Sequence, residues 1–545
     1  MPRRLMDGST PIRVGSAIRG VVRQGYGRDD AKADLLAGVI TGVVALPLSM
    51  ALAIAAGAPP QHGLFTAIVG GIVIALAGGS MHSVSGPTAA FVVLLAPVTA
   101  QYGFAGLAMA SLMAGVIMLA MGLARLGKLI QFIPHPVTTG FTAGIGVVIA
   151  FLQLGDVLGV GSISGEHLWD RLAALAARMS DVRWQEMMLA LVTIGIILGL
   201  PRFSRRIPSP LVALVVAAVL GAVLAAAGHE VVTIGTRFGG IPAVPPLPTL
   251  PWAGGGIDLT VVRALLGPAL AIALLGAIES LLCAVVADGM TGARHDSDAE
   301  LIGLGLGNIV APFFGGFAAT GAIARSATAI RAGARTPLAV VVHSVFILIA
   351  MLALAPLLGT LPMAAMGGLL LVVAWNMSDV GHFIRILRTA PRSDVMVLLV
   401  CFGLTVAFDM VIAVGVGVVL AAFLFMRRMI EISGATLVGA QHPKAAGMIA
   451  PGTVHYEIAG PLFFGAAQKA LEALTTVDHT VDTVIIDLGD VPAIDATGLV
   501  ALESALQHLR RSSVVVRIVD VRPQPLRALF KAGIVDGEGL TVMAA

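Results

Sequence analysis

Two charged side chains stand inside long apolar stretches of this 545-residue chain, and these are the positions where chemistry is expected. Glu279 lies in the middle of LLGAIESLLCAVVADG, residues 274–289, and Arg325 lies in AATGAIARSATAIRAG, residues 318–333. A charge within the bilayer is costly unless it has a partner or a water-filled cavity. The acid could therefore exchange a proton, and the arginine could bind an anion.

Two stretches interrupt apolar segments in a similar way. In HSVSGPTAAFVVLL (residues 82–95), Ser85 can cap a helix and Pro87 suits a first turn, which predicts a helix that starts within residues 85–88. Thr320 and Gly321 could open a second helix whose first turns carry Arg325. Paired helix starts at mid-membrane depth would bind an anion through their N–H groups and dipoles. The alternatives are an ordinary loop-to-helix junction at the first break and snorkelling of Arg325 to the cytoplasmic surface.

Glu279 and Asp288 are expected to have different roles. On a continuous helix Glu279 lies about 24 Å beyond Arg263, well inside the bilayer, and Asp288 falls on the opposite face. We therefore expect Glu279 to face the Arg325 region, where it would suit a proton-coupled carrier. Asp288 is expected to be structural, at the cytoplasmic end of the helix. A buried acid that is hydrogen-bonded for packing is the alternative for Glu279.

The composition is that of a membrane protein. The chain is 57% hydrophobic and 12% charged, with a mean hydropathy of +0.95. No charged residue occurs from Leu35 to Ala124, a length for about four helical crossings. The sequence predicts a polytopic α-helical fold with fourteen segments, which begin near residues 36, 64, 84, 104, 133, 186, 210, 262, 299, 320, 337, 362, 394 and 411.

Basic residues predict the orientation. They gather before the first segment and in the even-numbered loops, for example at Arg202, Arg331 and Arg385, whereas the short odd loops have none. The positive-inside rule then places both termini in the cytoplasm, and the Arg-rich start does not resemble a cleavable signal peptide. Cys283 and Cys401 both lie in apolar segments, so no disulfide is expected.

The C-terminal part is predicted to be a small α/β module. TVIIDLGDV (483–491) and VVVRIVDV (514–521) indicate buried strands, and residues 497–511 have helical spacing. We expect a cytoplasmic N-terminal segment over residues 1–34, a transmembrane transport domain over 35–430, an exposed linker over 431–451 and the cytoplasmic module over 452–545.

Several long blocks resemble the SulP, or sulfate permease, family of anion transporters. They are ITGVVALPLSMALAIAAGAPPQHGLFTAIVGGIV (40–73), GGSMHSVSGPTAAF (78–91), IESLLCAVVADGMTG (278–292) and ELIGLGLGNIVAPFFGG (300–316). The C-terminal module is similar to a STAS domain through AIDATGLVALE (493–503). Within the family, GAIESLLCAVVADGMTG, GNIVAPFFGG and VAWNMSD resemble the bacterial C4-dicarboxylate transporter most closely.

This resemblance implies two inverted seven-helix repeats, divided into a core and a gate domain, usually in a homodimer with an elevator-like movement of the core. The family's anion site lies between the third and tenth spans, with contributions from the first and eighth. The acidic position in the eighth span, here Glu279, serves proton or cation coupling in bacterial members. Carried over by motif, the substrate-binding residues are Ser49, Ser85, Gly86, Pro87, Thr88, Ala89, Ile323, Ala324, Arg325 and Ser326.

Two positions depart from the vertebrate pattern. Leu48 stands where prestin-like members have Gln, and Ala324 where they have Ser. The site is therefore expected to use backbone N–H groups and Arg325 more than polar side chains, which leaves room for a larger organic anion.

The function expected from this resemblance is proton-coupled, or sodium-coupled, uptake of C4-dicarboxylates such as succinate, fumarate and aspartate across a bacterial inner membrane. Bicarbonate or sulfate transport is the alternative within the family, and an anion channel or membrane sensor is the alternative outside it. No metal-ligand spacing, nucleophile elbow or phosphate loop is found, so neither an enzyme nor a cofactor is expected. No basic run with aromatics suggests nucleic-acid binding.

The STAS resemblance raises the question of regulation. Thr497 occupies the place of the phosphorylatable hydroxyl in anti-sigma-factor antagonists, where a phosphate at a helix N-terminus would be favourable. The favoured interpretation of Thr497 is nevertheless a plain helix cap. A cytoplasmic regulatory partner is expected to bind this domain.

Overall fold

The computed structural model describes residues 14–128, 134–161, 168–204, 208–252, 258–408, 410–432, 434–437, 452–463, 467–468, 471, 481–537 and 539–545. Residues 1–13 of the predicted N-terminal segment, and residues 438–451 of the predicted linker, lie outside this part of the chain. The chain divides into two compact units, Met1–Val418 and Val419–Ala545.

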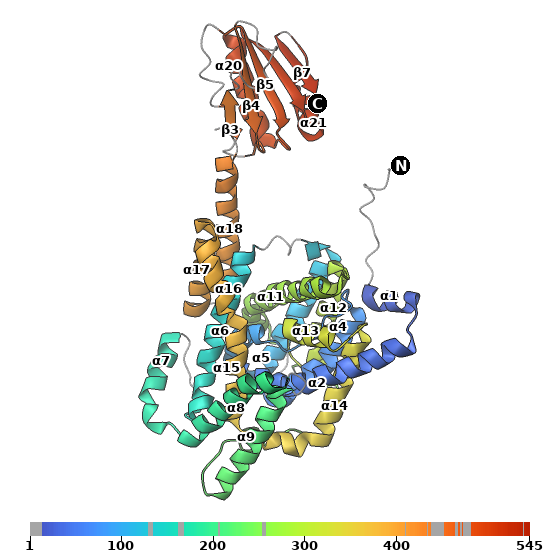
Figure 1. Ribbon diagram of the computed structural model, residues 1–545, viewed down its shortest axis with the longest axis vertical. Helices are drawn as coiled ribbons and strands as arrows, with labels where there is room; N and C mark the ends of the chain where they lie inside the picture. The colour runs from blue at the N-terminus through green and yellow to red at the C-terminus, as the bar shows by residue number, and fades with distance from the viewer. Residues whose placement is uncertain are drawn as a thin grey trace. The chain divides into compact units, whose positions relative to one another are not determined.

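The first unit is helical (Figure 1). Its elements, with the helix that leads into the second unit, are α1 (Ser16–Gln24), α2 (Arg28–Ala55), α3 (Pro60–Phe65), η1 (Thr66–Gly70), α4 (Gly71–Ala77), α5 (Ala89–Leu123), α6 (His135–Leu158), α7 (Leu168–Ala177), η3 (Met179–Asp181), α8 (Trp184–Phe203), α9 (Ser209–Ala226), α10 (Ile234–Phe238), α11 (Leu259–Thr291), α12 (Ser297–Val310), η4 (Ala311–Phe314), α13 (Ile323–Arg331), α14 (Leu338–Gly359), α15 (Met363–Ser378), α16 (Val380–Thr389), α17 (Arg392–Ala407) and α18 (Met410–Ile432).

Each of the fourteen predicted segments coincides with a helix of this series. The third and fourth are the two parts of α5, which Gly103 divides because its backbone has a positive φ of 66°. Within the described residues, nine helices are long and apolar enough to cross a membrane. The chain is therefore a polytopic α-helical membrane protein, as predicted.

Contacts divide these helices into two groups. In the first, α5 packs on α11 and α12, while α14 packs on α2 and α4. In the second, α6 packs on α15 and α17, while α8 packs on α9 and α15. Figure 1 shows α11, α12, α13 and α4 close together, with α7, α8 and α9 at another edge of the unit. These groups correspond to the predicted core and gate domains.

Small residues permit the close crossing of α5 and α12. A Cβ added to Gly305 would lie 2.5 Å from the backbone nitrogen of Leu119, and one added to Gly115 would lie 2.9 Å from the carbonyl oxygen of Gly305. Because lipid tails are as apolar as the helices, such close packing, rather than burial from water, is what holds membrane helices together. This crossing fixes the second part of α5, after Gly103, against α12.

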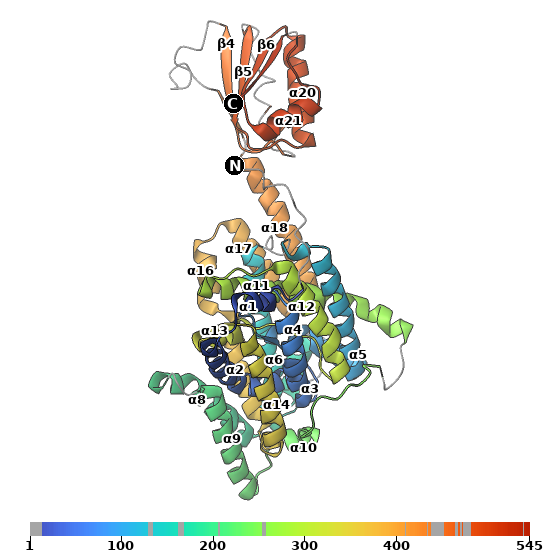
Figure 2. The same ribbon diagram turned by 90° about the vertical axis from the view of Figure 1, so that its right-hand side faces the viewer.

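The second unit contains a five-stranded sheet in the order β3 (Gly434–Leu437), β4 (Thr453–Ala459), β5 (Thr483–Asp490), β6 (Val515–Val521) and β7 (Leu540–Ala544). The pairs from β4 to β7 are parallel, and β3 is antiparallel to β4. Helices α20 (Ala496–Arg511) and α21 (Pro523–Lys531) lie on the same face of the sheet (Figure 2). Apolar residues of the strands and α20 form its core, including Ile486, Ile518 and Leu502.

One strand lies where the sequence predicted an exposed linker. Gly434–Leu437 pairs with Ala459 through Tyr456 and so belongs to the sheet. The short sequence GATL gave no alternating pattern from which a strand could be predicted. The sheet therefore begins before residue 452, the predicted start of the domain.

Candidate functional site

The two breaks lie side by side. Ser85–Gly86 forms β1, Thr320–Gly321 forms β2, and these strands pair antiparallel, with Ser85 opposite Gly321 and Gly86 opposite Thr320. Helix α5 begins at Ala89, shortly after β1, and α13 begins at Ile323, shortly after β2. The pairing therefore brings the N-termini of two helices together from distant parts of the sequence.

Neither helix start has a side-chain cap. Thr88 is the N-cap residue of α5 and Ala322 that of α13, and neither side chain accepts a hydrogen bond from the helix. The prediction that Ser85 caps the first helix is wrong, because Ser85 is in β1 and its Oγ is buried without a hydrogen-bond partner. First-turn N–H groups that no side chain satisfies are suited to an anion.

Arg325 joins the two breaks. It is the third residue of α13 and only 2% exposed, and its Nη2 donates to the carbonyl oxygen of Pro87. Its Nε and Nη1 have no hydrogen-bond partner in the described part of the protein. A Cβ on Gly86 would lie 2.6 Å from Nη1, so the glycine leaves the space that the guanidinium occupies. A buried cation with two free donors next to two helix N-termini can bind an anion.

Glu279 reaches the same break from α11. Its Oε2 accepts a hydrogen bond from Thr88 Oγ1 at 3.2 Å, and its side chain is partly exposed. Glu279 and Arg325 thus contact consecutive residues, Thr88 and Pro87. Glu279 and Arg325 do not form an ion pair with each other. Each side chain instead makes its hydrogen bond to a residue of the first break, which lies between them. The acid therefore lies in the arginine's region, as expected.

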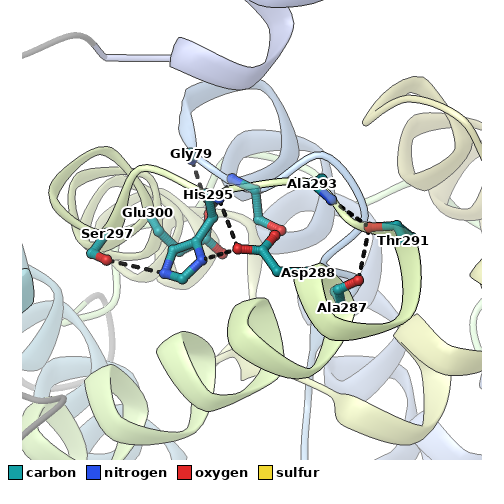
Figure 3. A network of polar contacts seen from close by, with 9 residues as sticks. Gly79, Ala287, Asp288, Thr291, Ala293, His295, Ser297 and Glu300 are labelled. Atoms are coloured by element: carbon teal, nitrogen blue, oxygen red, sulfur yellow. Dashed lines mark hydrogen bonds and ion pairs between the residues drawn. The ribbon is translucent and has the colours of Figure 1, made fainter.

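Asp288 belongs to a separate network at the end of α11 (Figure 3). Its Oδ2 lies 2.7 Å from His295 Nδ1 and accepts from the His295 backbone nitrogen at 2.9 Å. Asp288 therefore holds the turn between α11 and α12 and, as expected, does not share a site with Glu279.

The other predicted site residues differ in how deeply they are buried and in what they contact. Ser326 is buried, and its Oγ accepts from the Val84 backbone nitrogen at 2.8 Å, so it fixes the first break. Ile323 and Ala324 are exposed, and Ala89 is partly exposed. Ser49 of α2 is fully buried with an unpartnered Oγ, and no hydrogen bond connects it to either break among the described residues.

Three buried polar residues that hold the breaks were missed from sequence. Glu300 Oε2 accepts from the backbone nitrogens of Gly79 and Ser80, both at 2.9 Å, and Figure 3 shows Glu300 beside Gly79. Asn308 accepts from Ala319 N at 2.7 Å and donates to its carbonyl oxygen at 2.9 Å, while Thr66 Oγ1 accepts from Phe317 N at 2.9 Å. The sequence signal that could have found these three residues is a polar side chain inside an apolar helix, because such a side chain needs a buried hydrogen-bond partner.

In the second unit, Thr497 lies in the first turn of α20 and is exposed. The helix cap is Asp495, whose side chain accepts from the Gly498 nitrogen at 2.8 Å. The interpretation of Thr497 as a plain cap is therefore wrong, because the preceding aspartate takes that role. Its hydroxyl stands at the positive end of a helix and open to solvent.

Two discontinuous helices that meet around a buried arginine, in a polytopic unit followed by an α/β module, define the class of membrane anion transporters with a STAS domain. The chain belongs to the sulfate permease family, which it matches over residues 32–401, and its residues 448–541 match the STAS domain.

Named relatives agree with this assignment. The chain is 38% identical over 515 residues to the putative sulfate transporter YvdB of Bacillus subtilis, covering 94% of this chain and 95% of YvdB. It is 32% identical over 517 residues to the bicarbonate transporter BicA of Synechocystis, covering 91% and 90% of the two chains. The fold matches the inward-facing structure of murine Slc26a9, an anion transporter, with a TM-score of 0.86, 19% identity and coverage of 100% and 95%.

Proposed function

We propose that this protein is a secondary active transporter of a small inorganic anion, bicarbonate or sulfate, across the bacterial inner membrane. The observation that carries the proposal is Arg325, a buried cation with two unpartnered donors between the N-termini of α5 and α13. The names of YvdB and BicA favour sulfate and bicarbonate. None of the relatives named above is described as a transporter of C4-dicarboxylates, which the sequence favoured.

In this proposal Glu279 couples transport to a proton or to sodium. It is the acid that contacts the break through Thr88, and its partial exposure gives an ion access to it. A bound proton or sodium would neutralise the carboxylate, which would otherwise repel an incoming anion from the neighbouring Arg325 region. Cation and anion would therefore bind together, as symport requires.

Uptake into proteoliposomes tests the substrate. Labelled sulfate, bicarbonate and succinate are offered with no gradient, with an inward proton gradient and with an inward sodium gradient. We expect saturable uptake of sulfate or bicarbonate that one of the two cation gradients drives. Saturable uptake of succinate alone would restore the dicarboxylate interpretation, and conductance without saturable uptake would favour a channel.

We further propose that both termini are cytoplasmic, that the protein is a homodimer and that the core moves like an elevator against the gate. The basic even loops support the orientation. The division of the helices into two packed groups supports the movement. In the STAS domain we propose a site for a regulatory partner at the exposed Thr497, where phosphorylation would place a charge at the N-terminus of α20.

A further inference from the structure

Helix α16 is a short amphipathic helix between α15 and α17. Asp379 separates it from α15 by a left-handed backbone turn with φ of 34° and caps it, because its Oδ1 accepts from the His382 nitrogen at 3.3 Å. Ten residues of helix extend about 15 Å, half of what a crossing needs. Helix α16 alone is therefore too short to span the bilayer.

One side of α16 packs on the protein. The Phe383 ring lies 5.3 Å from that of Phe402 in α17, and the His382 ring lies 5.1 Å from that of His135 in α6, measured between centroids. Figure 2 shows α16 at the edge of the helical unit, next to α17. These contacts fix which side of the helix is turned outward.

Next to Phe383, the helix carries an apolar stripe that the described structure covers only in part. Val380, Ile384 and Leu387 are 37%, 40% and 36% exposed, and their spacing places them on one helix face. Trp375, one turn before the bend, is 66% exposed. Exposed tryptophan is typical of the level where hydrocarbon meets water. The stripe therefore begins at the membrane interface.

Arginines border this stripe. Arg385 and Arg388 follow it around the helix, and Arg392 begins α17; all three are exposed. In the described part of the chain none of the three guanidinium groups has a hydrogen bond or an ion pair, whereas that of Arg335 pairs with Asp30 at 2.9 Å. Helix α16 itself contains no acidic residue. The three charges are therefore free for a partner outside the chain.

We propose that α16 lies in the cytoplasmic surface of the bilayer and binds the phosphates of acidic phospholipids through Arg385, Arg388 and Arg392. The apolar stripe would insert among the upper parts of the lipid tails, and the guanidiniums would lie at the depth of the headgroups. This inference rests on the proposed orientation of the chain and not on the identity of the transported anion. Lipid bound here would anchor the helix group of α6, α15 and α17 in the membrane.

The test uses the full-length protein in nanodiscs of phosphatidylcholine with and without phosphatidylglycerol, and native mass spectrometry counts the lipids that stay bound. We expect wild type to retain phosphatidylglycerol in preference to phosphatidylcholine. The double variant Arg385→Gln/Arg388→Gln should bind it about fivefold more weakly per arginine removed. The variant Arg385→Lys/Arg388→Lys should keep most of the binding. Arg510→Gln/Arg511→Gln, which removes equal charge from an exposed site in the second unit, is the matched control.

Several outcomes would overturn the proposal. They are equal retention of phosphatidylglycerol by the glutamine variant, equal retention of phosphatidylcholine by wild type, and displacement of the lipid by low concentrations of inorganic phosphate. Loss of dimers in the glutamine variant would show that the surface binds a second copy instead. If that variant fails to fold, the salt dependence of wild-type binding provides the test. Retention of phosphatidylglycerol that does not weaken with added salt would contradict binding through arginines, because salt screens exposed charges.

Discussion

At the residue scale, the site depends on two side chains that meet the same break. Glu279 contacts Thr88, and Arg325 contacts the neighbouring Pro87. An anion held by the free nitrogens of Arg325 would thus lie close to a carboxylate, and the charge on that carboxylate would decide how tightly the anion binds. The coupling of the two ions can be tested by removing each charge separately.

The first prediction concerns Glu279→Gln. The amide oxygen can still accept from Thr88 Oγ1, so the fold should be kept, but the side chain can no longer exchange a proton. We expect loss of gradient-driven accumulation, with counterflow exchange of the anion retained, both measured in proteoliposomes. Glu186→Gln is the control, because Glu186 is an acid of another membrane helix, and its Oε1 accepts from the backbone nitrogen of Val232 at 2.8 Å. Accumulation at the wild-type level would contradict the coupling role.

The second prediction pairs Arg325→Ala with Gly86→Ala. Loss of hydrogen bonds from a charged group, about 1.5–3 kcal/mol, should raise the KM for the anion roughly 10- to 100-fold. A Cβ at Gly86 would meet Arg325 Nη1 at 2.6 Å and push the guanidinium aside, so Gly86→Ala should raise KM in the same direction with little loss of thermal stability. Gly289→Ala, where no atom lies within 4 Å, is the control. An unchanged KM in Arg325→Ala would remove the arginine from the site.

At the element scale, the breaks are held open by polar side chains of the surrounding helices. Asn308 of α12 makes both hydrogen bonds of the Ala319 peptide groups, and Ser326 of α13 satisfies Val84 N. A backbone that leaves helical geometry inside a membrane needs such partners, since lipid offers none. The helix starts can therefore point at an anion without collapsing onto each other.

The third prediction is that Asn308→Ala destabilises the protein. It leaves the N–H and C=O of Ala319 buried without a partner, at about 1–3 kcal/mol for each. We expect a clearly lower melting temperature in detergent and reduced transport at the growth temperature. Asn376→Ala, on an exposed position of α15, is the matched control and should melt like wild type. Equal melting of the two variants would show that Asn308 does not hold the second break.

The helices and the breaks could be predicted from sequence because both depend on local patterns. A long apolar run predicts a span, and Ser-Gly-Pro-Thr at residues 85–88 predicts an interruption. The pairing of Ser85 with Gly321 could only be inferred from the corresponding positions of the breaks, because it joins distant segments. The roles of Glu300 and Asn308 depend on which backbone groups face them, which no local pattern contains.

At the scale of the whole molecule, the membrane unit and the STAS domain differ in what stabilises them. Close packing of small residues holds α5 against α12, whereas a buried apolar core of strands and α20 holds the second unit. The part of the second unit from β3 onward should thus fold in water by itself. Its sheet includes β3, which lies before the start that the sequence predicted.

The fourth prediction concerns this strand. A soluble fragment that begins at Gly434 should melt several degrees above one that begins at Gly452, since β3 covers the outer edge of β4, and each kcal/mol corresponds to about 4–8 °C in a domain of this size. Circular dichroism measures both melting curves. The control is Ala435→Pro/Thr436→Pro in the longer fragment, which has the same length but lacks two backbone donors, and it should melt like the shorter one. If both fragments melt together, β3 adds nothing to the domain, and residues 434–437 act only as a connection to α18.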